Sequence, residues 1–236
     1  MEVNIFGEGA VGYKNIVKSS SSQDFFLYKK YKNYAVCTVA DGHSMDVFKY
    51  SHIGSYLACQ SVFEILKTYK LNEDIEKGEQ NFICDLKNKK VQNDIKNKWR
   101  DLVYREFYKR NYKVYKLDYM LFGTTLSFVI FLKEYIVFFN LGDSSILIKE
   151  DKDYVNVFKN NNFKFVNSLA LYNCEEKMQY SILKMNKDFK LVISTDGFIN
   201  SFETYHKLKS ELDRTFQILE KDIFSNRYLR NIYKKH

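Results

Sequence analysis

Residues 34–43 read YAVCTVADGH, an apolar run that ends in an acidic turn. The same arrangement recurs in residues 135–143, YIVFFNLGD, and in residues 190–197, KLVISTDG. Each run has the length and the β-branched and aromatic content of a buried strand, and each is followed by an aspartate beside a glycine. A strand end holds a side chain firmly, and glycine lets backbone or ligand approach closely. The repeated pattern therefore suits a rigid group of carboxylates.

Strands and helices are expected from the spacing of apolar residues. The strands cover residues 24–30, 34–40, 124–131, 135–141, 145–149 and 190–194. Helical spacing is found at Ile53, Leu57, Val62 and Ile65 or Leu66, and again at Val91, Ile95, Trp99 and Leu102 or Val103. A last helix is expected from Thr204, with a stripe that should pack against a sheet, formed by Leu208, Leu212, Phe216, Leu219 and Ile223. Strands on both sides of a helical pair predict an α+β fold, with two stacked antiparallel β-sheets flanked by helices.

Length and composition indicate one soluble, folded domain over residues 1–236, because neither a repeat nor a linker interrupts the chain. No basic leader and no apolar stretch near ~18 residues is present, so neither a signal peptide nor a membrane span is expected. The cysteines lack metal-binding or redox spacing and are expected to be free thiols; they are Cys37, Cys59, Cys84 and Cys174. We therefore expect a cytoplasmic monomer.

The positive charge of the chain is concentrated in one segment. Residues 86–116 hold eleven Lys and Arg against three Asp and Glu, which equals the net charge of +8 of the whole sequence. Such a segment could attract nucleic acid, anionic lipid or an acidic partner. No nucleic-acid-binding motif accompanies it, so we expect a solvated helix face outside the chemistry, and nucleic acid is not an expected partner.

The acids at the strand ends have the chemistry of a site for a hard cation. Asp41, Asp143 and Asp196 each follow an apolar run, and Asp24 opens one. Oxygen ligands suit Mg²⁺ or Mn²⁺ better than zinc or copper. Taken singly, each of these acids could instead be an ordinary turn residue, and Gly142-Asp143 is also expected to be the tip of a hairpin.

The order of these motifs resembles the metal-dependent protein phosphatases of type 2C, in particular their small bacterial branch, from Ile5 to about Ser201. The matching signatures are Gln23-Asp24, Ala40-Asp41-Gly42-His43, Gly123-Thr124-Thr125, Gly142-Asp143-Ser144 and Thr195-Asp196-Gly197-Phe198. The resemblance implies the α-β-β-α sandwich of that family. It also implies hydrolysis of phosphoserine and phosphothreonine in phosphoproteins, by water that two or three Mg²⁺ or Mn²⁺ ions activate.

The resemblance also implies a role for each matching residue. Asp41 would bridge two ions, with the carbonyl of Gly42 as a further ligand. Asp196 would bind the first ion and help to bind a third ion. Asp143 would be the acid of this third site. Asp24 would reach an ion through water. His43 would be the general acid that protonates the leaving alcohol.

Three departures from the family pattern affect these expectations. Gln23 stands where glutamate is common, which would remove one negative charge from the metal cluster. Ser19 stands where an arginine often binds phosphate, with only Lys18 nearby. The final strand and its metal-binding acid are not recognisable, because the nearest match is residues 212–216, which should lie in a helix.

The missing final acid leaves three explanations open. Asp213 is expected to be a surface helix residue. Either the natural chain is longer, or another acid such as Asp222 supplies the ligand, or the first metal site is impaired. The leading hypothesis is a Mg²⁺- or Mn²⁺-dependent protein phosphatase. The alternatives are a weak or inactive relative that binds a phosphoprotein or another partner, and a basic module that binds nucleic acid or a membrane surface.

Overall fold

The computed structural model describes residues 3–9, 22–110, 116–158, 166–185 and 189–221. Its larger sheet has five antiparallel strands in the order β1-β2-β3-β4-β7. They are β1 (Phe25–Lys30), β2 (Ala35–Ala40), β3 (Leu126–Phe131), β4 (Tyr135–Leu141) and β7 (Gln179–Lys184). The smaller sheet has the order β6-β5-β8, also antiparallel. Its strands are β5 (Ser145–Glu150), β6 (Asp153–Asn156) and β8 (Leu191–Ser194).

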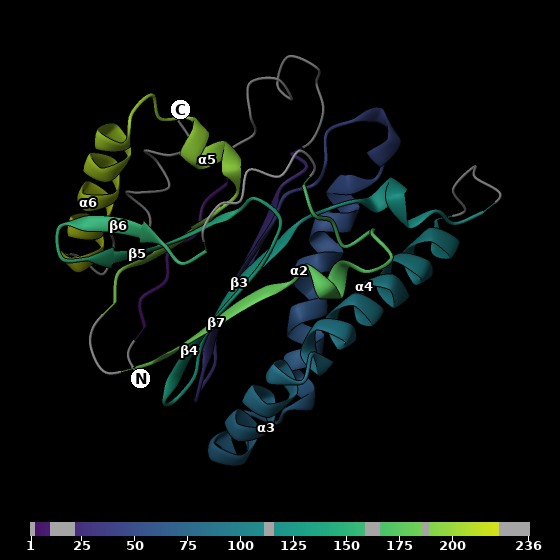
Figure 1. Ribbon diagram of the computed structural model, residues 1–236, viewed down its shortest axis with the longest axis horizontal. Coiled ribbons are helices and arrows are strands. Elements are labelled where there is room, and N and C mark those ends of the chain that lie inside the picture. The colour runs from purple at the N-terminus through teal and green to yellow at the C-terminus, as the bar shows by residue number, and fades with distance from the viewer. Residues whose placement is uncertain (1–2, 10–21, 111–115, 159–165, 186–188, 222–236) are drawn as a thin grey trace.

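The two sheets lie between helices, which confirms the expected α+β sandwich (Figure 1). Three helices cover the larger sheet: α2 (Ser51–Thr68), α3 (Ile75–Lys87) and α4 (Lys90–Lys109). The smaller sheet is covered by α6 (Tyr205–Lys221), and the short α5 (Asp196–Asn200) follows β8 directly. Three short 3₁₀ helices lie in the connections: η1 (Asp46–Phe48), η2 (Tyr119–Phe122) and η3 (Cys174–Glu176).

Alternating side chains divide the core into layers. Phe128 of β3 belongs to the cluster under α2 and α4, whereas its neighbour Val129 belongs to the cluster between the sheets. In the smaller sheet Ile146 faces the larger sheet, and Leu147 faces α6, where it meets Leu208. Because successive strand residues point to opposite faces, strands that are apolar throughout are buried on both sides. The expected packing of the C-terminal helical stripe on a sheet is confirmed for Leu208, Leu212 and Phe216; Leu219 is not part of this cluster, and Ile223 lies outside the described residues.

The expectation that Gly142-Asp143 is a hairpin tip is wrong. β4 belongs to the larger sheet and β5 to the smaller one, so the turn carries the chain from one sheet to the other. Gly142 has φ of 119°, which favours glycine, and a Cβ there would lie 2.5 Å from the side chain of Thr125. The turn thus places Asp143 at the boundary between the two sheets.

Several elements were not expected from the sequence. β7 forms one edge of the larger sheet and is largely exposed, and β6 is only four residues long. α3 lies between the two expected helices; Asp74 caps it by accepting a hydrogen bond from the backbone of Lys77 at 3.1 Å. Glu79 of α3 is buried and accepts a hydrogen bond from the backbone of Glu134, in the turn between β3 and β4, at 3.1 Å.

The basic segment is spread over two helices rather than one, because Leu86 and Lys87 end α3 before α4 begins. Several of its cations form ion pairs: Lys89 with Glu176, Lys90 with Asp85 and Asp94, Lys96 with Glu175, Arg105 with Asp101, and Arg110 with Glu106. Lys87, Lys89 and Lys90 are exposed, so this end of the segment is solvated, as expected. Much of the local charge is therefore neutralised by neighbouring acids.

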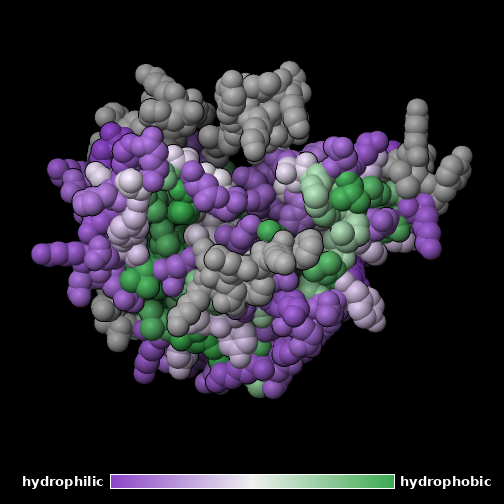
Figure 2. All heavy atoms as spheres, turned by 45° about the horizontal axis from the view of Figure 1, so that its top comes forward, coloured by the Kyte–Doolittle hydropathy of each residue, from purple (hydrophilic) through white to green (hydrophobic). Residues whose placement is uncertain are grey.

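The face shown in Figure 2 is mainly hydrophilic, with hydrophobic side chains gathered in smaller patches. All four cysteines are free, as expected, and only Cys84 is exposed. Within the described ranges, none of the helices has the length and apolar character needed to span a membrane.

Candidate functional site

The fold brings together acids from both sheets. Asp24 precedes β1 and Asp41 follows β2, whereas Asp196 comes after β8 and begins α5. The carboxyl of Asp41 lies within hydrogen-bonding reach of both Asp24 and Asp196. The hydroxyl of Thr195 donates to Asp24 at 3.0 Å, which ties the end of the smaller sheet to the start of β1. Asp143 lies close enough for the negative charges of Asp196 and Asp24 to repel its carboxylate.

The backbone of Asp41 is held by the two threonines that precede β3. The Asp41 N–H donates to the hydroxyl of Thr125 at 2.9 Å, and the Asp41 carbonyl accepts from the Thr125 N–H at 2.9 Å. The hydroxyl of Thr124 donates to the same carbonyl at 2.9 Å. Thr124 is held in turn by Ser168, which is buried: the backbone N–H of Thr124 donates to the hydroxyl oxygen of Ser168 at 3.1 Å. These bonds explain why the Gly-Thr-Thr signature belongs with the acids, although it contributes no carboxylate.

Burial and mutual repulsion perturb the acids. Burial, followed by the charge of Asp24 and then that of Asp196, raises the pKa of Asp41 to about 9. Burial also raises the pKa of Asp24 and that of Asp143, with Asp196 adding to both shifts. Within the described ranges, no Lys, Arg or His forms an ion pair with any of these carboxylates. The charge of these acids when ionised is therefore not offset by a cationic side chain of the described residues, and the raised pKa of Asp41 reflects this.

The donor set fits a hard divalent cation by its chemistry. Carboxylate oxygens are the ligands that Mg²⁺ and Mn²⁺ favour, and a cation would offset the burial and the repulsion that together raise the pKa of Asp41. One oxygen of Asp143 is buried and has no hydrogen-bond partner, which leaves it available to a ligand. As the side chains stand, no three His, Cys, Asp or Glu residues in the part of the chain that the structure describes are arranged to hold an ion.

His43 lies directly beside the acids, after Asp41 and Gly42. Its backbone N–H donates to the carbonyl of Gly123 at 3.2 Å. Its imidazole ring packs against the ring of Phe48, with the ring centroids 4.7 Å apart. Burial lowers the pKa of the imidazole. Gly42 has no room for a side chain, because a Cβ would lie 2.6 Å from the carbonyl oxygen of Gln23 and 2.9 Å from that of Ser51.

The three departures seen in the sequence have different outcomes. Gln23 is more than a missing charge, since its side-chain nitrogen donates to the carbonyl of His43 at 3.0 Å. Ser19, Lys18 and Asp222 lie outside the described residues. No strand follows β8 in the part of the chain that the structure covers, and Asp213 is a helix residue, as expected.

Asp213 lies on the far side of the smaller sheet from the larger one. It accepts hydrogen bonds from Lys149 of β5 at 2.5 Å and from the hydroxyl of Tyr154 of β6 at 2.9 Å. Its neighbour Leu212 belongs to the cluster between the smaller sheet and α6. Asp213 is therefore not brought to the acids.

Sequence reasoning missed the residues that support the acids rather than join them. Ser51, Ser55 and Ser168 are buried and bond to the backbone or side chains around the acidic turns. Two of these serines stand on the buried face of α2, which is a signal that the sequence did contain. Ser168 lies in an irregular segment and had no such signal.

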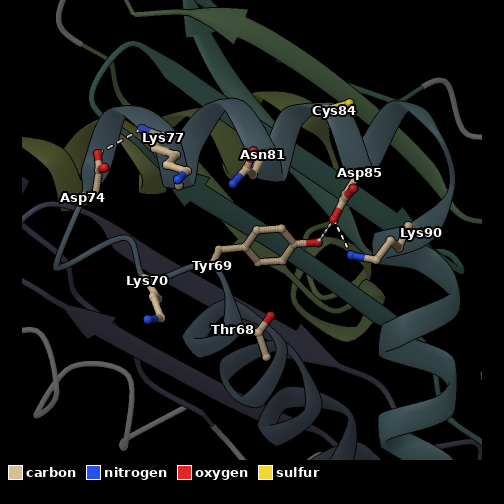
Figure 3. Close-up of a pocket in the computed structure, with 10 residues that line it drawn as sticks. Thr68, Tyr69, Lys70, Asp74, Lys77, Asn81, Cys84, Asp85 and Lys90 are labelled. Carbon is tan, nitrogen blue, oxygen red and sulfur yellow. Dashed lines mark hydrogen bonds and ion pairs between the residues drawn. The ribbon is translucent and has the colours of Figure 1, made fainter.

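A pocket of about 510 Å³ lies elsewhere, between the end of α2, one face of α3 and the start of α4 (Figure 3). Two of its charged groups neutralise each other, since Lys90 pairs with Asp85 at 2.5 Å; the hydroxyl of Tyr69 also donates to Asp85, at 3.0 Å. None of the site residues expected from the sequence lines it. The acids at the strand ends remain the stronger candidate site.

The family model described as Protein phosphatase 2C matches residues 11–232. The fold is similar to that of the S. agalactiae serine/threonine phosphatase, with 16% identity, a TM-score of 0.56, and coverage of 96% of this chain and 88% of that one. It is also similar to the M. tuberculosis serine/threonine phosphatase PstP/Ppp, with 12% identity and a TM-score of 0.54 over 97% and 88% of the two chains.

A structure of the PstP catalytic domain in complex with two manganese ions has 11% identity and a TM-score of 0.53, over 97% of this chain and 88% of that one. At these identities the likeness concerns the fold alone. No curated protein sequence matches the chain significantly.

Proposed function

The chain belongs to the protein phosphatase 2C family, and from that premise we propose that it hydrolyses phosphoserine and phosphothreonine in phosphoproteins with the help of Mg²⁺ or Mn²⁺. The observation that carries this proposal is the group of Asp24, Asp41 and Asp196, of which Asp41 and Asp196 are partly buried; the acids repel one another and have no counter-charge among the described residues. Such an arrangement is costly in its ionised form unless cations occupy it. The two manganese ions in the PstP structure support the same assignment.

The residues that would hold the ions are Asp24, Asp41, the carbonyl of Gly42, Asp143 and Asp196. When bound, two such ions lower the pKa of a water molecule and offset the charge of the phosphate oxygens. Thr124 and Thr125 hold the Asp41 backbone, so that its carboxyl is positioned by both β2 and β3.

His43 would hold a proton on its imidazole for the departing serine or threonine oxygen. An alkoxide leaves poorly without a proton, whereas nitrophenolate leaves readily. The burial that lowers the pKa of His43 favours proton donation once the imidazole is charged, but it reduces the charged fraction at neutral pH. The contribution of His43 should therefore be greatest on the acidic side of neutrality.

A second candidate function is a weakly active or inactive relative that binds a phosphoprotein. The observation that favours it is the absence of a further acid-bearing strand after β8 in the described part of the chain.

Phosphate release separates the two candidates. Wild-type protein is incubated with p-nitrophenyl phosphate and with a phosphoserine peptide, in Mn²⁺ and then in excess chelator. The enzyme proposal expects turnover of both substrates that chelation removes. A folded protein that releases no phosphate at saturating Mn²⁺ would favour the second candidate.

A further inference from the structure

Gln23 connects three segments that meet at the acids. Its side-chain nitrogen donates to the carbonyl of His43 at 3.0 Å and to the hydroxyl of Ser51, the first residue of α2, at 3.0 Å. Its backbone carbonyl accepts from the N–H of Gly42 at 3.2 Å and from the hydroxyl of Ser55 at 2.6 Å. Gln23, which precedes β1, thus binds both the turn after β2 and the start of α2.

The chemistry of these contacts requires an amide. A backbone carbonyl such as that of His43 only accepts hydrogen bonds, so the side-chain atom facing it must be the nitrogen of Gln23. An ionised glutamate has no proton to donate and would place a negative oxygen against the carbonyl. The side chain of Gln23 is therefore a donor to the acidic turn, and not a ligand that has lost its charge.

The contacts of Gln23 fix His43 from a second direction. The His43 N–H is already bound to Gly123, so with Gln23 both polar backbone atoms of His43 have partners on different segments. Ser51 is fully buried, which gives the second acceptor of Gln23 a fixed place. Without the amide, the carbonyl of His43 and the hydroxyl of Ser51 would each lose this donor, and His43 would be free to move relative to α2.

We propose that Gln23 is a positioning residue, which holds His43, at the end of the acidic turn, on α2 so that its imidazole can reach the leaving oxygen, whereas Asp41 is held separately by Thr124 and Thr125. The inference rests on the proposed function for its catalytic consequence. Its structural part, the attachment of the turn to α2, can be measured without activity.

The kinetic test compares Gln23→Met, which keeps the length of the side chain but cannot donate, with Gln23→Glu, which keeps the shape but can only accept. Both should lower kcat for the phosphoserine peptide about tenfold, the lower end of what a supporting hydrogen-bond partner contributes. Turnover of p-nitrophenyl phosphate should stay within about twofold, because its leaving group needs no proton. Combined with His43→Ala, neither variant should lower the phosphoserine rate further.

The matched control is Ser61→Ala. Ser61 is also a buried serine of α2, but its hydroxyl donates only to the carbonyl of Ala58 in the same helix, at 2.7 Å. This variant should leave the ratio of the two rates unchanged. The proposal would be overturned if Gln23→Met lowered both rates equally or lowered neither, because the ratio of the two rates would then be unchanged. If Gln23→Met does not fold, Ser51→Ala removes one acceptor only and should shift the ratio in the same direction.

Amide hydrogen exchange decides the structural part even if the wild type releases no phosphate. Exchange over residues 43–55 should become about tenfold faster in Gln23→Met than in wild type or Ser61→Ala, while exchange in β4 stays the same. An inactive wild type with this pattern would refute the proposed function and keep the attachment. Unchanged exchange over residues 43–55 would refute the role of Gln23 itself.

Discussion

Asp213 offers a sharp prediction, because the sequence left it as the nearest match to the missing metal-binding acid. In the structure it accepts from Lys149 at 2.5 Å and from Tyr154 at 2.9 Å, across the interface between α6 and the smaller sheet. The side chains of Asp213 and Lys149 are 30% and 23% exposed, so water weakens their attraction only in part. Asp213→Asn should therefore destabilise the fold and leave turnover unchanged.

The magnitude follows from what each variant removes. Asparagine can still accept from Tyr154, so Asp213→Asn loses mainly the ion pair, worth about 1 kcal/mol at a partly exposed position. Asp213→Ala also loses the bond to the nearly buried tyrosine and should cost about 2 kcal/mol. For a chain of this size, 1 kcal/mol corresponds to roughly 2–4 °C in Tm. Asp213→Asn should thus lower Tm by about 2–4 °C, and Asp213→Ala by about twice as much.

The assay pairs thermal melting with Mn²⁺-dependent hydrolysis of p-nitrophenyl phosphate, and Asp196→Asn serves as the contrasting variant. Asp196→Asn should abolish turnover without lowering Tm, since it removes a charge that repels Asp24 and Asp41. The reasoning would be refuted if Asp213→Asn abolished turnover at unchanged Tm, because Asp213 would then be a ligand.

The pH dependence gives an independent check on Asp213. The hydrogen bond from Lys149 lowers the pKa of Asp213 below its usual 3.8. A carboxyl whose pKa is lowered in the folded state stabilises the fold above its unfolded pKa, and this contribution disappears as the pH falls through the folded pKa. The stability difference between wild type and Asp213→Asn should be constant from about pH 5 to 8 and shrink only below about pH 4.

Three further variants test the surroundings of the site. His43→Ala should reduce kcat for a phosphoserine peptide by about 10²- to 10⁴-fold and barely affect p-nitrophenyl phosphate; equal losses would make the histidine structural. Gly42→Ala should reduce both stability and turnover, measured by melting and phosphate release, because its Cβ would lie 2.6 and 2.9 Å from backbone carbonyl oxygens; a fully active variant would show that the turn is not confined. Reversing Lys87, Lys89 and Lys90 to Glu should leave turnover of p-nitrophenyl phosphate within about twofold and lower Tm, since exposed ion pairs with Glu176 and Asp85 are lost; a large loss of rate would place the site elsewhere.

The strands were predictable from the sequence where a continuous apolar run is also buried in the structure. Residues 135–141 match β4 in both bounds because the strand is buried on both faces, and the same holds closely for β2. β7 was missed because it is an edge strand with exposed residues at both ends. α3 was missed because its buried stripe is sparse, with Phe82 and Leu86 as its large buried residues in a highly charged segment.

The places of the acids beside strands were predictable, because Asp41, Asp143 and Asp196 each follow an apolar run and Asp24 precedes one, which is a local signal. Their supports were not, since the bonds of Gln23 depend on how α2 docks beside the turn, and that is set by tertiary packing. The hairpin expected at Gly142 failed for the same reason: a local turn signal does not say which sheet the next strand joins.

Binding of Mn²⁺ tests the central claim most directly, namely that the acids at the strand ends form the metal centre of a phosphatase. Calorimetric titration of Mn²⁺ into wild type should show saturable binding. Asp41→Asn should lose it while remaining folded, because Asp41 lies within reach of both Asp24 and Asp196 and asparagine lacks the negative charge that a hard cation requires. If Asp41→Asn bound Mn²⁺ with the same stoichiometry and affinity as wild type, the ions would be held elsewhere and the assignment of the site would be wrong.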